Sequence, residues 1–173
     1  MKTALRVLGP VLVTVAVAAG CGTSTAAQPA AGNAAGPGVS EQLRFTATTV
    51  DGQAFSGASL AGKPAVLWFW TPWCETCQEE AAGVAKAAQA HQGKVTFLGV
   101  GAEDKAPAMK DFVTRYHTGS FTNIADTNAA LWQRFGITEQ PGYAFISPQG
   151  TVEIVKTPME DDELAAKVDQ LAR

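Results

Sequence analysis

The feature that most constrains the fold is an uninterrupted apolar run at residues 65–70, which has the length of a strand buried on both faces. Residues 74–91 follow and are rich in Ala, Glu, Gln and Lys, which are good helix formers, and Gly93 stands where that helix would be capped. Residues 95–101 form a second short apolar run. Strand, helix and strand in this order predict a βαβ unit, which implies a parallel sheet.

The segments after this unit predict further elements. Pro107 could open a helix over residues 107–117, residues 121–125 could form a short strand, and Thr127 could cap another helix. The apolar side chains of the two helices are expected in the core rather than at a cofactor: Met109, Phe112, Val113, Tyr116, Leu131, Trp132 and Phe135.

The remaining segments lie at the two ends of the predicted domain. Residues 43–47 alternate at the period of a strand, and a turn signal follows at residues 50–53. Residues 143–147 and 151–156 flank a Pro-Gln-Gly turn and are predicted to form a hairpin. Residues 161–172 predict an amphipathic helix whose acidic start suits the positive end of the helix dipole.

Residues 1–20 have the pattern of a secretory signal peptide, because Lys2 and Arg6 precede a short apolar run that ends in small residues. The run is too short for a comfortable membrane-spanning helix, so we expect the protein to be exported. Residues 17–21 resemble the lipobox of bacterial lipoproteins, which implies that Cys21 is lipidated and anchors the protein to the outer face of the cytoplasmic membrane. The alternative is an ordinary cleaved signal peptide and a secreted protein.

Residues 22–39 carry no charge and consist almost entirely of small or polar residues, which cannot bury enough apolar surface to offset their ordering entropy. We therefore expect residues 21–39 to be a flexible tether with a reach of about 20–25 Å. Residues 40–173 then form one folded domain. Without Lys2 and Arg6 the chain keeps 11 basic and 16 acidic residues, a net charge of −5, and no basic cluster indicates a nucleic-acid partner.

Two of the three cysteines, Cys74 and Cys77, lie where the apolar strand gives way to the helix. At a helix N-terminus the dipole and the free N–H groups favour a thiolate, so Cys74 is the expected nucleophile. Cys77 follows one turn later and is expected to point inward, where it can resolve a mixed disulfide on Cys74. This division of work is what thiol–disulfide exchange needs.

Two other uses of the cysteine pair are weaker. A zinc site needs about four ligands, and only His91 and His117 are available besides the pair, without the spacing of a zinc module. Both histidines are expected near helix C-termini, where a surface histidine is unremarkable. A purely structural disulfide would close too small a loop to constrain the unfolded chain much. We expect neither a metal nor another cofactor.

The segment FWTPWCETC and its surroundings resemble the thioredoxin superfamily, and within it the DsbE/TlpA/ResA-like envelope group, including its lipoprotein and secreted members in Gram-positive bacteria. The resemblance covers residues 40–173, and these segments carry it: residues 51–52, 60–64, 69–77, Glu80, 135–137 and 140–141. It implies an α/β thioredoxin fold, in which helices flank a central mixed β-sheet and a βα element is inserted.

The resemblance also assigns site residues. Pro141 would be a cis-proline beside the cysteine pair, and Gln140 before it would pair its backbone with a substrate peptide. Glu80 shares a helix face with Cys77 and would take part in proton transfer. The alternative for Glu80 is an ordinary solvated glutamate. Trp68 stands where thioredoxin has a buried aspartate, which favours Glu80 as the acid of the site.

Together these features predict an extracytoplasmic thiol–disulfide oxidoreductase. Its substrates would be exported cysteine-containing proteins, and a membrane redox partner would recycle the pair. Trp73, beside the nucleophile, is expected to be exposed and to contact substrate, whereas Trp70 is expected in the core. We favour disulfide formation during oxidative folding, and the alternative is a reductase for cytochrome c maturation.

Two less favoured functions use the same fold. A thioredoxin-fold copper chaperone would have three residues between its cysteines, whereas Cys74 and Cys77 have two. A peroxidase would share Thr71, three residues before Cys74, but would have a proline at the position of Leu67.

Overall fold

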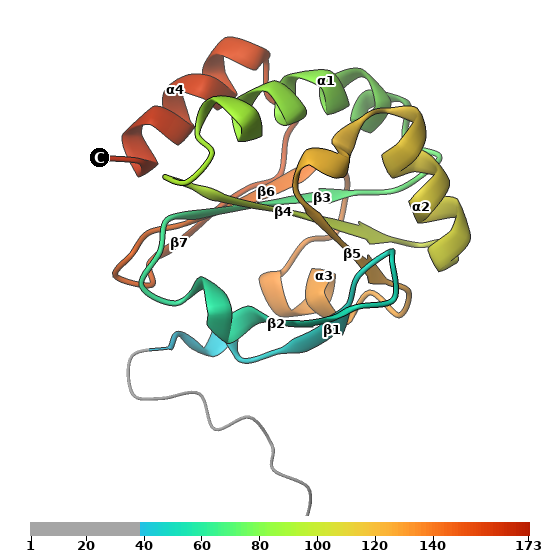
Figure 1. Ribbon diagram of the computed structural model, residues 1–173, viewed down its shortest axis with the longest axis horizontal. Coiled ribbons are helices and arrows are strands. Elements are labelled where there is room, and N and C mark those ends of the chain that lie inside the picture. The colour runs from blue at the N-terminus through green and yellow to red at the C-terminus, as the bar shows by residue number, and fades with distance from the viewer. Residues whose placement is uncertain (1–38) are drawn as a thin grey trace, which may run out of the picture. The chain divides into compact units, whose positions relative to one another are not determined.

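The computed structural model describes residues 39–173 (Figure 1). The predicted signal peptide, Cys21 and all but the last residue of the predicted tether lie outside the described residues. None of the helices within residues 39–173 is both long and apolar enough to cross a membrane.

A five-stranded mixed sheet forms the centre of the domain, in the order β5-β4-β3-β6-β7. Its strands are β3 (Ala65–Trp70), β4 (Thr96–Ala102), β5 (Thr122–Asp126), β6 (Gly142–Ile146) and β7 (Val152–Val155). β4 is parallel to both β3 and β5, whereas β6 pairs antiparallel with β3 and with β7. The predicted βαβ unit, the C-terminal hairpin and the mixed sheet are therefore confirmed.

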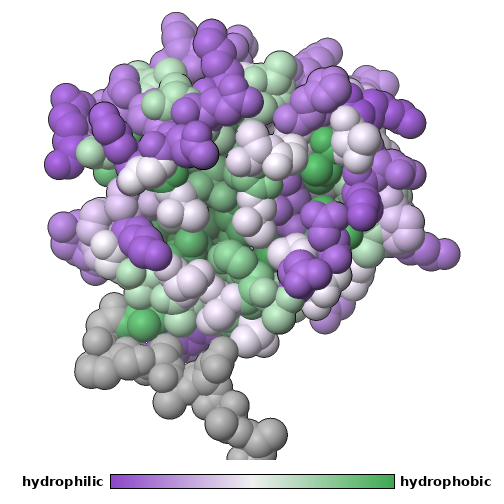
Figure 2. Space-filling model, viewed as in Figure 1, coloured by the Kyte–Doolittle hydropathy of each residue, from purple (hydrophilic) through white to green (hydrophobic). Residues whose placement is uncertain are grey.

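Helices cover both faces of this sheet (Figure 1). The helices are α1 (Glu75–Ala90), α2 (Ala106–Arg115), α3 (Ala130–Phe135) and α4 (Asp161–Leu171). α1, α2 and α4 lie on one face and α3 on the other, so each face has its own apolar cluster. β3 is buried along its whole length because its alternate side chains enter the two clusters. Figure 2 shows hydrophilic side chains gathered over α4, α1 and α2, above a more apolar band.

The N-terminal part of the domain differs from the prediction. The expected strand at residues 43–47 begins only at Thr46, because Glu41–Leu43 form a 3-10 turn that buries Leu43. β1 (Thr46–Thr48) and β2 (Ala54–Ser56) form a separate two-stranded sheet around the predicted turn. Its turn reaches the edge of β5, where the Val50 N–H donates to the Asn123 carbonyl at 2.9 Å. The hairpin therefore covers an edge that would otherwise expose unpaired backbone groups.

Short helical segments complete the chain, and one predicted cap is wrong. Two further 3-10 turns are Gly57–Leu60 and Thr118–Ser120. The Thr127 side chain does not cap α3, which begins three residues later. Instead the Asp126 carboxylate accepts from the N–H groups of Leu131 and Trp132 at 2.9 and 3.1 Å. The carboxylate at the end of β5 thus accepts from backbone N–H groups in the first turn of α3, which is the role that an N-cap side chain usually has.

Two glycines in β4 leave room for the large side chains at the end of β3. Gly99 and Gly101 stand opposite Trp68 and Trp70 in the parallel ladder. A methyl group on Gly101 would meet the Trp70 ring at 2.9 Å, closer than packing allows. Trp70 is fully buried, as expected, and stacks on Phe112 with 4.2 Å between ring centroids. This packing fixes the last residue of β3, from which the cysteine loop departs.

Candidate active site

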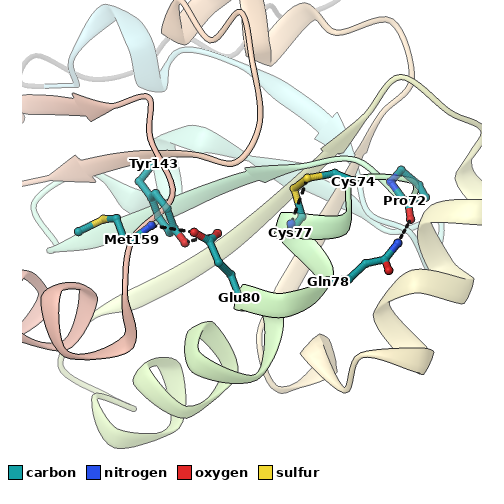
Figure 3. The surroundings of a disulfide bond; sticks show 7 residues. All are labelled: Pro72, Cys74, Cys77, Gln78, Glu80, Tyr143 and Met159. Carbon is teal, nitrogen blue, oxygen red and sulfur yellow. Dashed lines mark hydrogen bonds between the residues drawn. A yellow bond between two sulfur atoms is a disulfide. The ribbon is translucent and has the colours of Figure 1, made fainter.

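The cysteine pair lies at the junction of β3 and α1, as the sequence predicts (Figure 3). Cys74 and Cys77 are joined by a disulfide, and Cys74 is the N-cap of α1. Its sulfur accepts a hydrogen bond from the Cys77 backbone N–H at 3.0 Å. The same N–H and the positive end of the helix dipole would stabilise negative charge on this sulfur when the disulfide opens.

The two cysteines differ in their access to solvent. Cys77 is fully buried, whereas 7% of Cys74 is exposed. Trp73, immediately before Cys74, is 52% exposed, and within residues 39–173 it is the only large hydrophobic side chain that is exposed. Its indole N–H donates to the Glu103 carbonyl at 3.5 Å, which links the cysteine loop to the end of β4. An attacking thiol would therefore reach Cys74 before Cys77, beside an apolar surface.

Hydrogen bonds hold the loop that carries Trp73 and Cys74. The Cys74 N–H donates to the Thr71 carbonyl at 3.3 Å. The side-chain amide of Gln78 donates to the Pro72 carbonyl at 3.2 Å, so the first turn of α1 is tied back to the loop before it (Figure 3). Sequence reasoning did not identify Gln78, because a glutamine in a helix has no distinctive spacing.

Glu80 lies one turn after Cys77 on α1, and both of its carboxylate oxygens accept hydrogen bonds. The Tyr143 hydroxyl donates to Oε2 and the Met159 backbone N–H donates to Oε1, each at 2.7 Å (Figure 3). Burial raises the pKa of Glu80, the two hydrogen bonds and the nearby Trp68 indole lower it, and the charge of Glu160 raises it. Because burial is the largest effect, the net shift of the pKa is upward.

Tyr143 connects Glu80 to the strand that follows Pro141. The Gln140–Pro141 peptide bond is cis, as the family resemblance implies. Gly142 pairs with Phe69, so Pro141 lies near the end of β3, where the cysteine loop begins. Tyr143 is buried opposite Trp68, and burial together with Glu80 raises the pKa of its hydroxyl. The tyrosine therefore stays protonated and remains a hydrogen-bond donor.

Two residues considered for metal binding lie away from this site. Within residues 39–173, no three His, Cys, Asp or Glu side chains are grouped so that they could hold a metal ion. His117 is exposed. His91 is not the surface histidine that was expected, because it is buried between α1 and α4. Its two ring nitrogens face the Ala87 carbonyl and the Asp169 carboxylate at 2.9 and 2.8 Å.

Comparisons with known proteins agree with the cysteine geometry. The family model described as Redoxin matches residues 30–171. The soluble secreted antigen MPT53 of Mycobacterium tuberculosis is 44% identical over 134 residues, which are 76% of each chain. The thiol:disulfide interchange protein DsbE of Pseudomonas fluorescens biotype C is 29% identical over 133 residues, which are 73% of each chain.

A solved structure adds the match in three dimensions. The structure of MTB dsbF, in its mixed oxidised and reduced forms, is 51% identical to this chain with a TM-score of 0.75. The match covers 77% of this chain and 98% of that one. The expected fold and the expected kinship with DsbE-like proteins are confirmed. The chain belongs to the Redoxin family and is a thiol–disulfide oxidoreductase of the DsbE/ResA type with a thioredoxin fold.

Proposed function

We propose that this oxidoreductase works outside the cytoplasm and forms disulfides in exported, cysteine-containing proteins. The observation that carries the proposal is the disulfide at the start of α1, in which Cys77 is buried and Cys74 lies beside the exposed Trp73. Two observations support an extracytoplasmic site of action: the signal-peptide pattern of residues 1–20, and the similarity to the soluble secreted antigen MPT53.

The exchange proceeds in two steps on Cys74. A substrate thiolate attacks the Cys74 sulfur, the bond to Cys77 breaks, and Cys77 leaves as a thiolate that takes up a proton, with Glu80 as the proton donor. A second substrate thiolate then attacks the substrate sulfur of the mixed disulfide and releases Cys74 as a thiolate. The substrate gains a disulfide and the protein gains two electrons, which a membrane redox partner must accept to restore the pair.

Substrate binding would involve the residues around the disulfide. Trp73 offers an apolar surface next to Cys74. Gln140 and Pro141 precede β6 near the end of β3, where an extended peptide could pair with free backbone groups as an added strand. This mode recognises backbone rather than particular side chains, which suits a protein with many substrates.

The proposal also includes the direction of electron flow, from the substrate to the Cys74–Cys77 pair. The Cys77 N–H and the helix dipole stabilise a Cys74 thiolate, and stabilising the reduced form makes a pair more oxidising. Glu75, exposed between the two cysteines, places negative charge near that thiolate and opposes the effect. Glu75 thus supports the second candidate, a reductase for cytochrome c maturation.

The reduction potential of the Cys74–Cys77 couple tests the direction. We would equilibrate the exported protein with glutathione and dithiothreitol buffers and quantify its reduced fraction. A value between about −120 and −180 mV, in the range of oxidants and isomerases, is the expected result. A value near about −270 mV or below would instead indicate a reductase.

The location of the protein is a separate part of the proposal. We propose that lipidated Cys21 holds it at the outer face of the membrane, with secretion as the alternative. Replacing Cys21 with serine should then release the protein from the membrane fraction into the medium. A wild-type protein that is already free in the medium would support secretion.

A further inference from the structure

We propose that Tyr143 is a positioning residue for the exchange reaction, holding Glu80 in place as the proton carrier for Cys77. The inference rests on the proposed function, since it assigns a role to a residue next to the proposed proton donor. Sequence reasoning did not identify Tyr143, which is 63 residues from Glu80 in the chain.

The contacts around Glu80 leave it little freedom. Its carboxylate is fixed from two sides, by the Tyr143 hydroxyl on β6 and by the Met159 N–H just before α4, each at 2.7 Å. Glu80 therefore joins three separate segments of the fold, and Figure 3 shows its carboxylate directed toward both donors. Of the two donors, only the hydroxyl belongs to a side chain and can be removed by substitution.

The surroundings of Tyr143 suit this role. It lies two residues after Pro141 and opposite the fully buried Trp68. A buried hydroxyl gains little from solvent, so a charged acceptor such as Glu80 is its strongest available partner. The other charges that act on this pair are acidic and lie at the start of α4: Glu160 acts on Glu80, and Asp161 acts on Tyr143.

Removing the hydroxyl has a defined consequence for proton transfer. The Tyr143 hydrogen bond stabilises the charged carboxylate, so its loss would raise the pKa of Glu80 further. When the reduced protein reacts with oxidised glutathione, Cys77 must lose its proton and attack the Cys74–glutathione disulfide, which releases glutathione as a thiolate. The Glu80 carboxylate takes this proton. The step is therefore slow at low pH, because Glu80 is then already protonated and cannot accept it.

The test is the pH dependence of this second step, followed by stopped-flow from pH 4 to 8 with the exported protein and oxidised glutathione. Tyr143→Phe should shift the acid limb of the profile upward by about one pH unit, because a hydrogen bond to a charged group is worth about that much. Tyr116→Phe, which changes the chain's other tyrosine, is the matched control and should leave the limb unchanged.

A double substitution separates a role through Glu80 from a general packing effect. Glu80→Gln should remove the acid limb, and Tyr143→Phe should then cause no further change in that background. The Tyr143 assignment is overturned if Tyr143→Phe leaves the wild-type limb in place, or if it still alters the profile when Glu80 is glutamine. An unchanged profile in Glu80→Gln would overturn both this assignment and the proposed role of Glu80.

A further test uses the wild-type protein, so its result does not depend on whether a variant folds. The Tyr143 ring resonances should follow the titration of the Glu80 carboxyl group in NMR spectra. Resonances that ignore that titration would contradict the assignment. Failure of the proposed function looks different, because a reductase would still react with oxidised glutathione through Cys74, and only its reduction potential, near about −270 mV or below, would contradict disulfide formation.

Discussion

Single side chains in this site gain their chemistry from partners that are distant in sequence. Glu80 shares a helix face with Cys77 through local spacing, which the sequence predicts. Its hydrogen-bond partners Tyr143 and Met159 are 63 and 79 residues away, and they decide the orientation of its carboxylate. The raised pKa of Glu80 likewise comes mainly from burial, which depends on the packing of three segments.

Gln78 is a second residue whose role depends on such a contact. Gln78→Ala removes the hydrogen bond to the Pro72 carbonyl and should loosen the loop that carries Trp73 and Cys74. We expect the rate of exchange with a dithiol peptide to fall about five-fold, equivalent to about 1 kcal/mol, since one net hydrogen bond is lost.

The matched control is Gln89→Ala, because Gln89 is exposed near the end of the same helix. Its exchange rate should equal that of the wild type. Equal rates for all three proteins would mean that the amide of Gln78 does not hold the loop.

At the scale of elements, His91 joins the end of α1 to α4. Both of its ring nitrogens face acceptors, the Ala87 carbonyl and the Asp169 carboxylate, so only the doubly protonated imidazolium can donate to both. The hydrogen bonds to Asp169 and to Ala87 raise the pKa of His91, whereas burial and Lys94 lower it. The net shift is upward.

This contact makes the stability of the domain depend on pH. A pKa that is higher in the folded state contributes stability that is fully present below the unfolded value of about 6.5, and this contribution is lost as pH rises through the folded pKa. We expect a contribution of at most about 1 kcal/mol, because Asp169 is largely exposed.

Urea unfolding of the wild type and of His91→Asn at several pH values between 5 and 9 measures this contribution. The loss of stability in His91→Asn, relative to the wild type, should be larger at pH 5.5 than at pH 8.5. Asp169→Asn should show the same pattern with a smaller difference between the two pH values. A gap between wild type and His91→Asn that does not change with pH would contradict the assignment.

At the scale of the whole molecule, redox state and folding are linked. The disulfide closes a loop of only a few residues, so it constrains the unfolded chain little. The reduced form, in contrast, gains a Cys74 thiolate stabilised by the Cys77 N–H and the helix dipole. For an oxidant, the reduced protein should therefore be more stable than the oxidised protein.

The free energy of unfolding in urea, measured for the oxidised and the reduced protein, checks this prediction. Each 30 mV by which the folded couple is more oxidising than an unfolded pair corresponds to about 1.4 kcal/mol of extra stability in the reduced form. If the oxidised form is the more stable one, the protein is a reductase, and the measured reduction potential must agree.

Local patterns in the sequence determined much of the fold and the position of the site. The apolar run Ala65–Trp70 and the helix after it predict the β3–α1 junction, because strand and helix periodicities depend on neighbouring residues. The same local order places Cys74 at the N-cap. The cis peptide at Pro141 followed from family resemblance, since without that resemblance an ordinary trans turn is the expected geometry.

Tertiary structure alone decided the contacts between distant segments. The hairpin on the edge of β5, the burial of His91 against α4 and the capping of α3 by Asp126 all differ from local expectation. The same holds for the donors to Glu80. Such contacts depend on which segments the folded sheet and helices bring together. The periodicity of one segment contains no information about which distant segments will pack against it.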